Sequence, residues 1–360
     1  MTGYSHTITA DGGMQSASLS LVGTVDEMEA WLSDGLNRHV EVYSPDQVLV
    51  FEGFVDQITY SAGTLTATRG PLMNIANRIS VVYTPILSDD EDPPVTGTQT
   101  TTEIVDNETS QDKYGIVEQV FSAGTLYPDS AEALRDAYLE EIAWPETSET
   151  IGIGSTSEPS VELSILGYVS RLNTYITQDT TTQSIQISDP DGTGKLQQLI
   201  ADDPNGIFPA DYTGMEENNL LAQQYENENR TGWAAMQELV ELGNDTDNTR
   251  MTLGVYAGRR VVYATIPTDV EYEHRIADRA MRVERYGTGH EVRPWDVLPA
   301  RWTFLPDYMV GRQVPVDRRQ DPRYIFIESV SFSAPYNVDL TGSKVGTIRQ
   351  LLAKQGMWGS

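Results

Sequence analysis

Apolar and polar residues alternate along the N-terminal part of the chain with the period of two that is typical of β-strands. Small polar and apolar residues alternate over Ser16–Leu21, and His39–Tyr43 places Val40 and Val42 on one face. A longer and more apolar strand is expected over Val48–Tyr60. This pattern predicts a meander of antiparallel strands at the start of the chain.

Turn and helix signals surround the predicted strands. Gly63 supplies the positive φ that a hairpin loop needs after the long strand. The alternating segment Thr64–Thr68 then follows as the next strand. A short helix is expected over Asp26–Asp34, and another is expected from Pro71, because proline is favoured in the first turn of a helix.

The sequence Ser-Ala-Gly-Thr-Leu occurs twice, at Ser61–Leu65 and at Ser122–Leu126. Each copy follows an expected strand, which for the second copy is Ile116–Phe121. The first copy leads into another strand. The second leads into a predicted helix that begins with an Asp-x-x-Glu capping box at Asp129–Glu132. A duplicated module would continue alike after both copies, so we interpret the repeat as one turn sequence used twice.

Clear helix and hairpin signals also stand in the middle of the chain. Thr231 is a favourable N-cap for a helix over Trp233–Leu242, and Gly243 is a favourable stop. The segments Met251–Tyr256 and Arg260–Thr265 lie on either side of a short glycine-containing loop. They are predicted to form a β-hairpin.

Together these elements predict an α+β fold with mainly antiparallel strands, since strands and crossover helices do not alternate. An acidic, threonine-rich stretch separates the N-terminal strands from the mixed elements that follow. The expected boundaries are a strand-rich domain at 1–86, an acidic linker or exposed loop at 87–113, a middle α+β domain at 114–268, and a C-terminal β-rich domain with a terminal helix at 269–360.

The charge balance limits the possible partners. The chain of 360 residues has 53 acidic and 24 basic residues, a formal net charge of −29, and only four lysines. Binding to the phosphate backbone of nucleic acids is therefore not expected, since that affinity comes from basic patches. Three interpretations stay open: an ordinary acidic surface, a negative channel through which DNA slides without sticking, and adaptation to a high-salt host, where ions screen self-repulsion.

Composition and motifs argue against several classes of site. No cysteine is present, so disulfides and thiolate metal sites are excluded. No stretch predicts a membrane span, and the N-terminal residues do not read as a secretory signal. The four histidines show no metal-ligand spacing, and no Gly-x-Ser-x-Gly motif occurs. We expect no enzymatic activity, no catalytic or metal-binding residues and no cofactor, and His39 is expected to be a solvated or edge residue.

The segment Asp189–Lys195 carries two partial motifs. It lacks the first glycine and the final Ser/Thr of a P-loop. It has acidic residues at the first and third positions of a calcium-binding loop and glycine at the sixth, but Ile200 stands where a bidentate glutamate is needed. We interpret it as a glycine-rich loop after a hairpin over Tyr175–Asp189, with weak calcium binding as the alternative.

Arginine and tryptophan gather in the C-terminal part, in Arg293–Asp296 and at Arg301 and Trp302. Such side chains could stack on bases or sugars. The same residue types are enriched at protein interfaces. We favour packing against a neighbouring domain or subunit.

Segments spread over most of the chain resemble one protein family. Gly35–Arg78 resembles the first β-barrel domain of tail hub proteins from tailed phages and related viruses, through Phe51, Glu52, Gly53, Val55 and Ile58. Later segments that are similar to parts of phage tail proteins are Lys113–Leu139, Trp233–Pro267 and Val297–Pro335. These motifs consist of strand and turn residues, so the resemblance implies a structural role.

The resemblance implies a small N-terminal β-barrel and a non-enzymatic virion protein of the tail tip, made in the host cytoplasm. Hub proteins form a ring, usually a homotrimer. This ring lies beneath the tube or distal tail protein, where it closes the tail tube and carries the central spike or fibre. DNA would pass through such a ring without being bound.

The alternatives are a sixfold distal tail or adaptor protein, and a glycan-binding or wall-degrading tail protein. Subunit interfaces are expected at Val48, Val50, Phe51, Trp295, Arg301 and Trp302. Burial in the chain's own core is the competing interpretation for these apolar positions.

Overall fold

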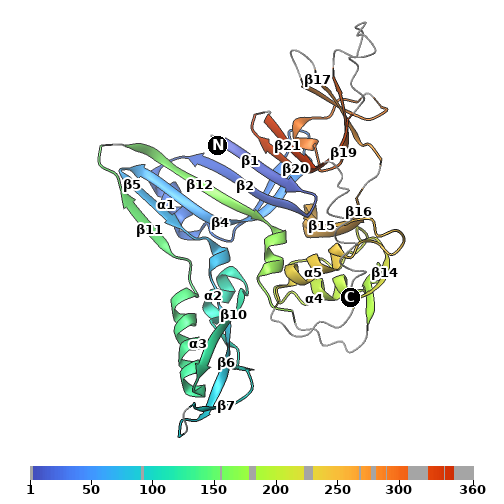
Figure 1. Cartoon of the computed structure of the whole chain (residues 1–360). Helices are drawn as coiled ribbons and strands as arrows, with labels where there is room; N and C mark the ends of the chain where they lie inside the picture. The colour runs from blue at the N-terminus through green and yellow to red at the C-terminus, as the bar shows by residue number, and fades with distance from the viewer. Residues whose placement is uncertain are drawn as a thin grey trace.

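The structure is a computed structural model of the chain, and it describes residues 3–90, 93–154, 156–177, 184–222, 230–266, 269–276, 281–288, 290–306, 323–335 and 337–343. In these residues the chain forms an α+β fold whose strands pair mainly antiparallel, as the sequence predicts (Figure 1). The helix expected near the C-terminus lies outside the described residues.

A large sheet of 14 strands forms the centre of the fold. Along its main path the strands are β11 (Thr147–Ile151), β5 (Leu65–Arg69), β4 (Leu49–Gly63), β12 (Ser157–Gly167), β2 (Gly12–Val22), β1 (Gly3–Thr9), β20 (Arg323–Ser333), β19 (Arg301–Pro306), β17 (Tyr272–Ile276) and β18 (Met281–Arg285). Beside this path, β3 (His39–Tyr43) pairs with β4, β15 (Met251–Tyr256) with β2, β16 (Arg260–Thr265) with β15, and β21 (Asn337–Ser343) with β20.

Strand β12 lies between β2 and β4, which are much earlier in the chain. Val161 of β12 pairs with Leu21 of β2 on one side and with Tyr60 of β4 on the other, antiparallel in both cases. Strand β20 pairs with β1 on the side of β1 that faces away from β2. The strands of residues 1–86 therefore do not form their sheet alone. Closure of these strands into a small barrel stays a prediction.

Helix α1 (Val25–Asp34) packs against β4 and β12. It begins with a capping box: Thr24 Oγ1 accepts the backbone N–H of Glu27, and the Glu27 carboxylate accepts the backbone N–H of Thr24 at 2.9 Å. These bonds satisfy N–H groups that have no partner inside the helix. A single 3₁₀ turn, η1 (Leu72–Asn74), forms where the sequence predicts a short helix after Pro71.

A lobe of strands and helices extends from the large sheet (Figure 1). It consists of β6 (Arg78–Ser88), β7 (Val95–Thr96), β8 (Thr100–Thr101), β9 (Val105–Asp106), α2 (Glu108–Tyr114), β10 (Glu118–Leu126) and α3 (Pro128–Ile142). Strand β10 runs parallel to β6, and the Phe121 ring stacks on Tyr138 of α3 with 4.4 Å between ring centroids.

The stretch expected as an acidic linker or exposed loop at 87–113 has more structure than predicted. Strands β7, β8 and β9 each pair with β6, because its backbone groups need hydrogen-bond partners. Most of their side chains are exposed, as the acidic composition predicts. All of α2 except its last residue, Tyr114, also falls in this stretch, and Ser110 there is buried.

The two copies of Ser-Ala-Gly-Thr-Leu have different structures. The first copy is the predicted hairpin: Gly63 has φ +59° at the end of β4, and Leu65 begins β5. The second copy lies inside β10, where the pairing with β6 shifts between Ser122 and Thr125. The interpretation as one turn used twice is wrong for the second copy, which forms a strand irregularity instead. The difference still argues against a duplicated module.

The predicted start of helix α3 is also wrong. The helix begins at Pro128 with Tyr127 as N-cap, and no side chain caps it. Asp129 lies within the first turn rather than at the cap. Proline at the first helical position needs no N–H partner, and this sets the start earlier than the capping-box pattern does.

A second lobe contains η2 (Tyr168–Asn173), β13 (Ile185–Ser188), α4 (Lys195–Ala201), β14 (Asn218–Ala222) and α5 (Gly232–Glu241). Thr231 Oγ1 accepts the backbone N–H of Ala234 at 3.3 Å, and Gly243 follows the helix, so both predicted ends of α5 are confirmed. Strand β13 pairs with β14. The middle of the hairpin expected over Tyr175–Asp189, at 178–183, lies outside the described residues.

The predicted hairpin of β15 and β16 is confirmed, with the 3₁₀ turn η3 (Ala257–Arg259) between its strands. A continuous apolar core joins the large sheet to the second lobe and includes Phe54, Ile58, Leu163 and Met236. A smaller core near the C-terminus is formed by Tyr272, Val297, Ala300, Ile327 and Val330. This packing fixes the β15–β16 hairpin next to β4, where the candidate site lies.

Candidate functional site

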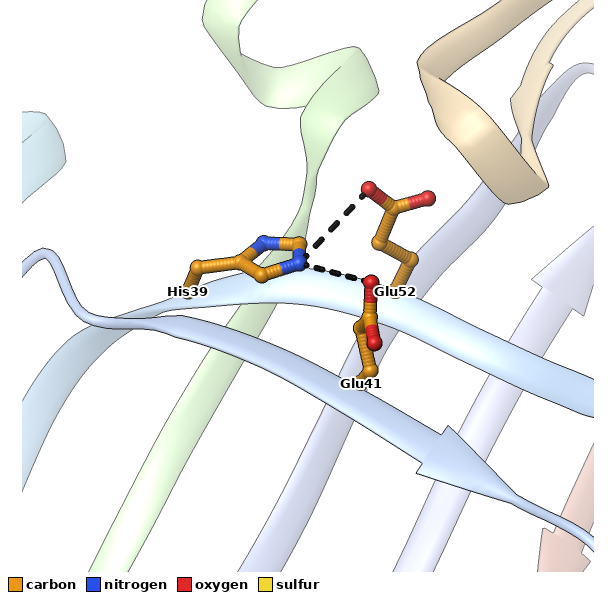
Figure 2. Close-up of side chains that lie close together, drawn as sticks. All are labelled: His39, Glu41 and Glu52. Carbon is orange, nitrogen blue, oxygen red and sulfur yellow. Dashed lines mark hydrogen bonds and ion pairs between the residues drawn. The ribbon is translucent and has the colours of Figure 1, made fainter.

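A cluster of three polar side chains lies on one face of the β3–β4 hairpin (Figure 2). Successive side chains of a strand point to opposite faces, so His39 and Glu41 share a face of β3. Glu52 is directly opposite Glu41 in the antiparallel pairing of β3 with β4. Figure 2 shows the imidazole pointing toward both carboxylates.

The imidazole of His39 contacts groups from three elements. Its Nδ1 lies 2.7 Å from the hydroxyl of Tyr168 in η2. Its Nε2 lies 3.1 Å from Glu41 Oε1 and 3.9 Å from Glu52 Oε1. His39 is on an outer strand of the described sheet, as expected, but its two ring nitrogens are both engaged.

Glu52 is the buried member of the cluster, with only 3% of its side chain exposed. Its Oε2 accepts the backbone N–H of Gly258 at 2.6 Å and that of Arg259 at 3.3 Å. Its Oε1 accepts the Nε–H of Arg259 at 3.2 Å. A buried carboxylate needs such partners, and here they come from the turn between β15 and β16.

The electrostatics of the cluster are set by two carboxylates and one guanidinium. Like charges directly opposite each other destabilise a strand pair, so Glu41 and Glu52 need nearby positive charge. Arg259 supplies part of it and also lies over the Tyr168 ring, with Cζ 5.1 Å from the ring centroid. Hydrogen bonds from the Tyr43 hydroxyl and then from His39 hold the pKa of the Glu41 carboxyl below its usual range.

The tyrosines beside the cluster stay protonated at neutral pH. The hydrogen bond to Glu41 raises the pKa of the Tyr43 hydroxyl, and burial raises the pKa of the Tyr168 hydroxyl. Each hydroxyl therefore has a proton to donate, and its oxygen can also accept a hydrogen bond.

The cluster lies beside a depression of about 430 Å³ that is open to solvent. Its lining includes Glu41, Glu52, Arg259 and the segment Gly206–Pro209. In the part of the chain that the structure describes, His39, Glu41 and Glu52 offer one ligand atom each, all within 4.8 Å of one another. The arrangement offers three donor atoms of the kinds that bind cations, and it ties the turn of the β15–β16 hairpin to β4.

The three predicted interface residues of β4 and the turn before it differ in exposure. Val48 is 53% exposed, whereas Val50 is 8% exposed and Phe51 is fully buried. Phe51 belongs to the main core and stacks on His6 with 6.0 Å between ring centroids. Core burial thus accounts for Val50 and Phe51, and Val48 is the residue of this group that a neighbouring subunit can reach.

The three predicted interface residues of the C-terminal part belong to two elements. The structure describes the side chain of Trp295 but not those of Arg301 and Trp302. Trp295 belongs to the 3₁₀ turn η4 (Pro294–Asp296) and packs, partly buried, against the main core. Arg293 lies over its ring, with Cζ 5.7 Å from the ring centroid. Arg301 and Trp302 belong to β19, and their side chains lie outside the described part of the structure.

The glycine-rich segment at Asp189 forms a loop, as predicted. Asp189 accepts the backbone N–H of Asp191 at 2.9 Å and the hydroxyl of Thr193 at 2.6 Å. These bonds close the loop internally. Weak calcium binding at this loop stays a prediction.

Sequence reasoning missed the cluster around His39. A search for histidine ligands at helical spacing could not find it, because β-strand neighbours on one face are two positions apart. The His-Val-Glu pattern at His39–Glu41 was the available signal. Tyr168 and Arg259 come from distant parts of the chain, and no local pattern points to them.

Comparisons with known proteins add the following findings. No protein-family model and no curated protein sequence matches the chain. Among solved structures, it is similar to a tail protein from Neisseria meningitidis MC58, with 11% identity and a TM-score of 0.32 over 81% of this chain and 94% of that chain. It is also similar to a prophage tail protein from Listeria monocytogenes EGD-e, with 8% identity and a TM-score of 0.28 over 85% of this chain and 95% of that chain. Both TM-scores are low, and the function proposed below rests on other observations.

Within the described residues, no helix combines the length and the apolar character that crossing a membrane requires.

Proposed function

We propose that this chain is a structural, non-enzymatic protein of the virion tail of a tailed phage or related virus. Within that class we propose a tail-tip hub: a homotrimeric ring that closes the tail tube and carries the central spike or fibre. Its neighbours would be the tube or distal tail protein above and the spike or fibre below. The resemblance of Gly35–Arg78 to the first domain of hub proteins supports this assignment.

The observation that carries the proposal is the position of β3 in the sheet. Among the described strands, β3 pairs only with β4, so its outer edge can accept a strand or loop of another subunit. Exposed apolar side chains lie at this end of the hairpin: Tyr43, the last residue of β3, is 50% exposed, and Val48, in the turn before β4, is 53% exposed. A ring forms when such a surface binds a different surface of the next subunit and the rotation between successive subunits brings the last one back to the first.

The net charge of −29 agrees with a channel for DNA. A negative lumen repels the phosphate backbone, so DNA can slide through without being held. The same charge also agrees with a high-salt host, which is a separate hypothesis about the environment of the protein.

Light scattering after size exclusion, at low and at molar salt, tests the proposed ring. A mass of three subunits at either salt is expected. A mass of six subunits would instead assign the chain to a distal tail or adaptor ring. Immunogold labelling of purified particles then tests its place: label at the tail tip is expected, and a monomer that is absent from virions contradicts the proposal.

A further inference from the structure

We propose that His39, Glu41 and Glu52 form a binding site for a divalent transition metal ion of the zinc type. The site is independent of the proposed tail function, because it rests only on the β3–β4 hairpin and its neighbours. His39 Nε2 lies 3.1 Å from Glu41 Oε1 and 3.9 Å from Glu52 Oε1. Three ligand atoms at these separations surround a point from which a single ion can reach all of them after small side-chain movements.

The donor set favours zinc over the common hard cations. One imidazole nitrogen and two carboxylate oxygens match the three protein ligands of open zinc sites, with water in the fourth position. Calcium and magnesium prefer all-oxygen ligand sets. His39 and Glu41 are about 40% exposed, so a solvent molecule can complete the coordination.

Each of the three ligands is oriented by a group outside the cluster. The Tyr168 hydroxyl can accept the Nδ1–H of His39, which leaves Nε2 as the ligating atom. The Tyr43 hydroxyl donates to Glu41 Oε2 at 2.7 Å. Backbone N–H groups of the turn after β15 hold Glu52 Oε2, which leaves Oε1 directed at the imidazole. Outer partners of this kind orient metal ligands and tune their affinity.

Arg259 competes with the metal ion for one ligand atom. Its Nε–H donates to Glu52 Oε1 at 3.2 Å, the same oxygen that faces His39. The guanidinium balances one of the two carboxylate charges, whereas a divalent ion balances both. When the ion binds, Arg259 gives up this bond and keeps its position over the Tyr168 ring.

Metal titration of the full chain tests the site. After treatment with a chelator, the protein is titrated with Zn²⁺ by calorimetry in the presence of excess Mg²⁺, which occupies nonspecific acidic positions. We expect one Zn²⁺ per chain in the wild type, and more than about tenfold weaker binding in His39→Gln and Glu41→Gln. The matched exposed controls, His290→Gln and Glu149→Gln, are expected to bind like the wild type.

Two further variants separate a metal site from a purely structural network. Arg259→Ala removes the competing cation and is expected to tighten Zn²⁺ binding, whereas Tyr168→Phe removes the outer partner of His39 and is expected to weaken it about tenfold. Co²⁺ added in place of Zn²⁺ should give the visible absorption of a four-coordinate site, and this band should be lost in His39→Gln.

Circular dichroism of each variant confirms that it is folded before titration. Absence of Zn²⁺ uptake by the folded wild type, or uptake that persists unchanged in both His39→Gln and Glu41→Gln, overturns the proposal. Unchanged or weaker binding in folded Arg259→Ala contradicts the competition. Glu52 is left intact in these tests because it also holds the backbone of the adjoining turn.

Discussion

The carboxylate of Glu52 accepts the backbone N–H of Gly258 at 2.6 Å, across 206 positions of the chain. This bond joins β4 to the turn of the β15–β16 hairpin, which lies in another part of the same large sheet. Because Glu52 is buried, the bond is shielded from water and holds the two parts together more firmly than a surface contact would.

Glu52→Ala is therefore expected to destabilise the fold by about 2–3 kcal/mol, because it leaves the N–H groups of Gly258 and Arg259 without an acceptor. Urea unfolding measures the loss. Glu41→Ala removes an exposed carboxylate and is expected to cost less than about 1 kcal/mol. Equal losses in the two variants would show that Glu52 does not hold the hairpin.

His6 makes stability depend on pH. It lies buried between Phe51 and Phe332, with its Nδ1 3.0 Å from the Tyr4 hydroxyl, and burial lowers its pKa from 6.5 to about 4. The unfolded chain therefore binds a proton on His6 at a higher pH than the folded chain does. The contribution of His6 to the free energy of unfolding is fully present above pH 6.5. It is lost as the pH drops toward about 4, and its size is on the order of 3 kcal/mol.

Unfolding of wild type and His6→Gln across this pH range measures the contribution. Gln does not titrate, and its side-chain oxygen can still accept a hydrogen bond from the Tyr4 hydroxyl. The variant should therefore lose less stability on acidification than the wild type. The exposed His290→Gln serves as the control and should keep the wild-type slope. Parallel pH profiles for wild type and His6→Gln would contradict the assignment.

Gly13 is required by the close pairing of β2 with β15. Its φ is +74°, and a Cβ placed there would lie 2.3 Å from the carbonyl oxygen of Val255. Gly13→Ala is expected to destabilise by about 2–4 kcal/mol, through backbone strain and overpacking. Gly124 has open space around the Cβ position, so Gly124→Ala should change the free energy of unfolding by less than about 0.5 kcal/mol. Thermal unfolding of both variants distinguishes these effects.

Val48 is the predicted interface residue that lies exposed at the β3–β4 turn. If a neighbouring subunit covers it, Val48→Asp should weaken ring association by about 2 kcal/mol, since a charge would be buried in an apolar contact. Val22→Asp changes a similarly exposed valine, 46% accessible, at the end of β2 and should leave assembly unchanged. Light scattering over a range of protein concentrations compares them. A ring of unchanged affinity in Val48→Asp excludes this residue from the interface.

The charge of −29 predicts that salt stabilises the fold. Screening of repulsion among exposed acids should raise the urea midpoint between low and molar potassium chloride, which corresponds to a gain in the free energy of unfolding on the order of 1 kcal/mol or more. The triple variant Glu132→Gln, Glu140→Gln and Glu141→Gln removes exposed charges of α3 and should show a smaller rise. A midpoint independent of salt would rule out adaptation to a salty environment.

The sequence predicts the local elements of this fold well, because local signals determine them. Alternation located β3 and β4, glycine located the hairpin at Gly63, and Thr231 with Gly243 located the ends of α5. The second Ser-Ala-Gly-Thr-Leu shows the limit of such signals. In the first copy the five residues end β4, turn and begin β5, whereas in the second copy they lie within the single strand β10, where β6 provides a pairing partner.

Long-range pairing and the candidate site were less accessible to sequence reasoning. The insertion of β12 between β2 and β4 depends on which edges are free in three dimensions, and no turn signal records it. His39 and Glu41 share a strand face that the alternation itself predicts. Their approach to Glu52 depends on the register of the hairpin, which shifts between Val42 and Tyr43, and Arg259 arrives from a distant hairpin.

The place of β12 also governs how the chain folds as it leaves the ribosome. Until residues 157–167 have emerged, β2 and β4 each lack the strand that separates them in the finished sheet, and β1 waits still longer for β20. Open strand edges readily pair with other chains. A nascent or prematurely terminated chain therefore exposes unpaired strand edges, and β1 gains its second neighbour only after residues 323–333 have been synthesised.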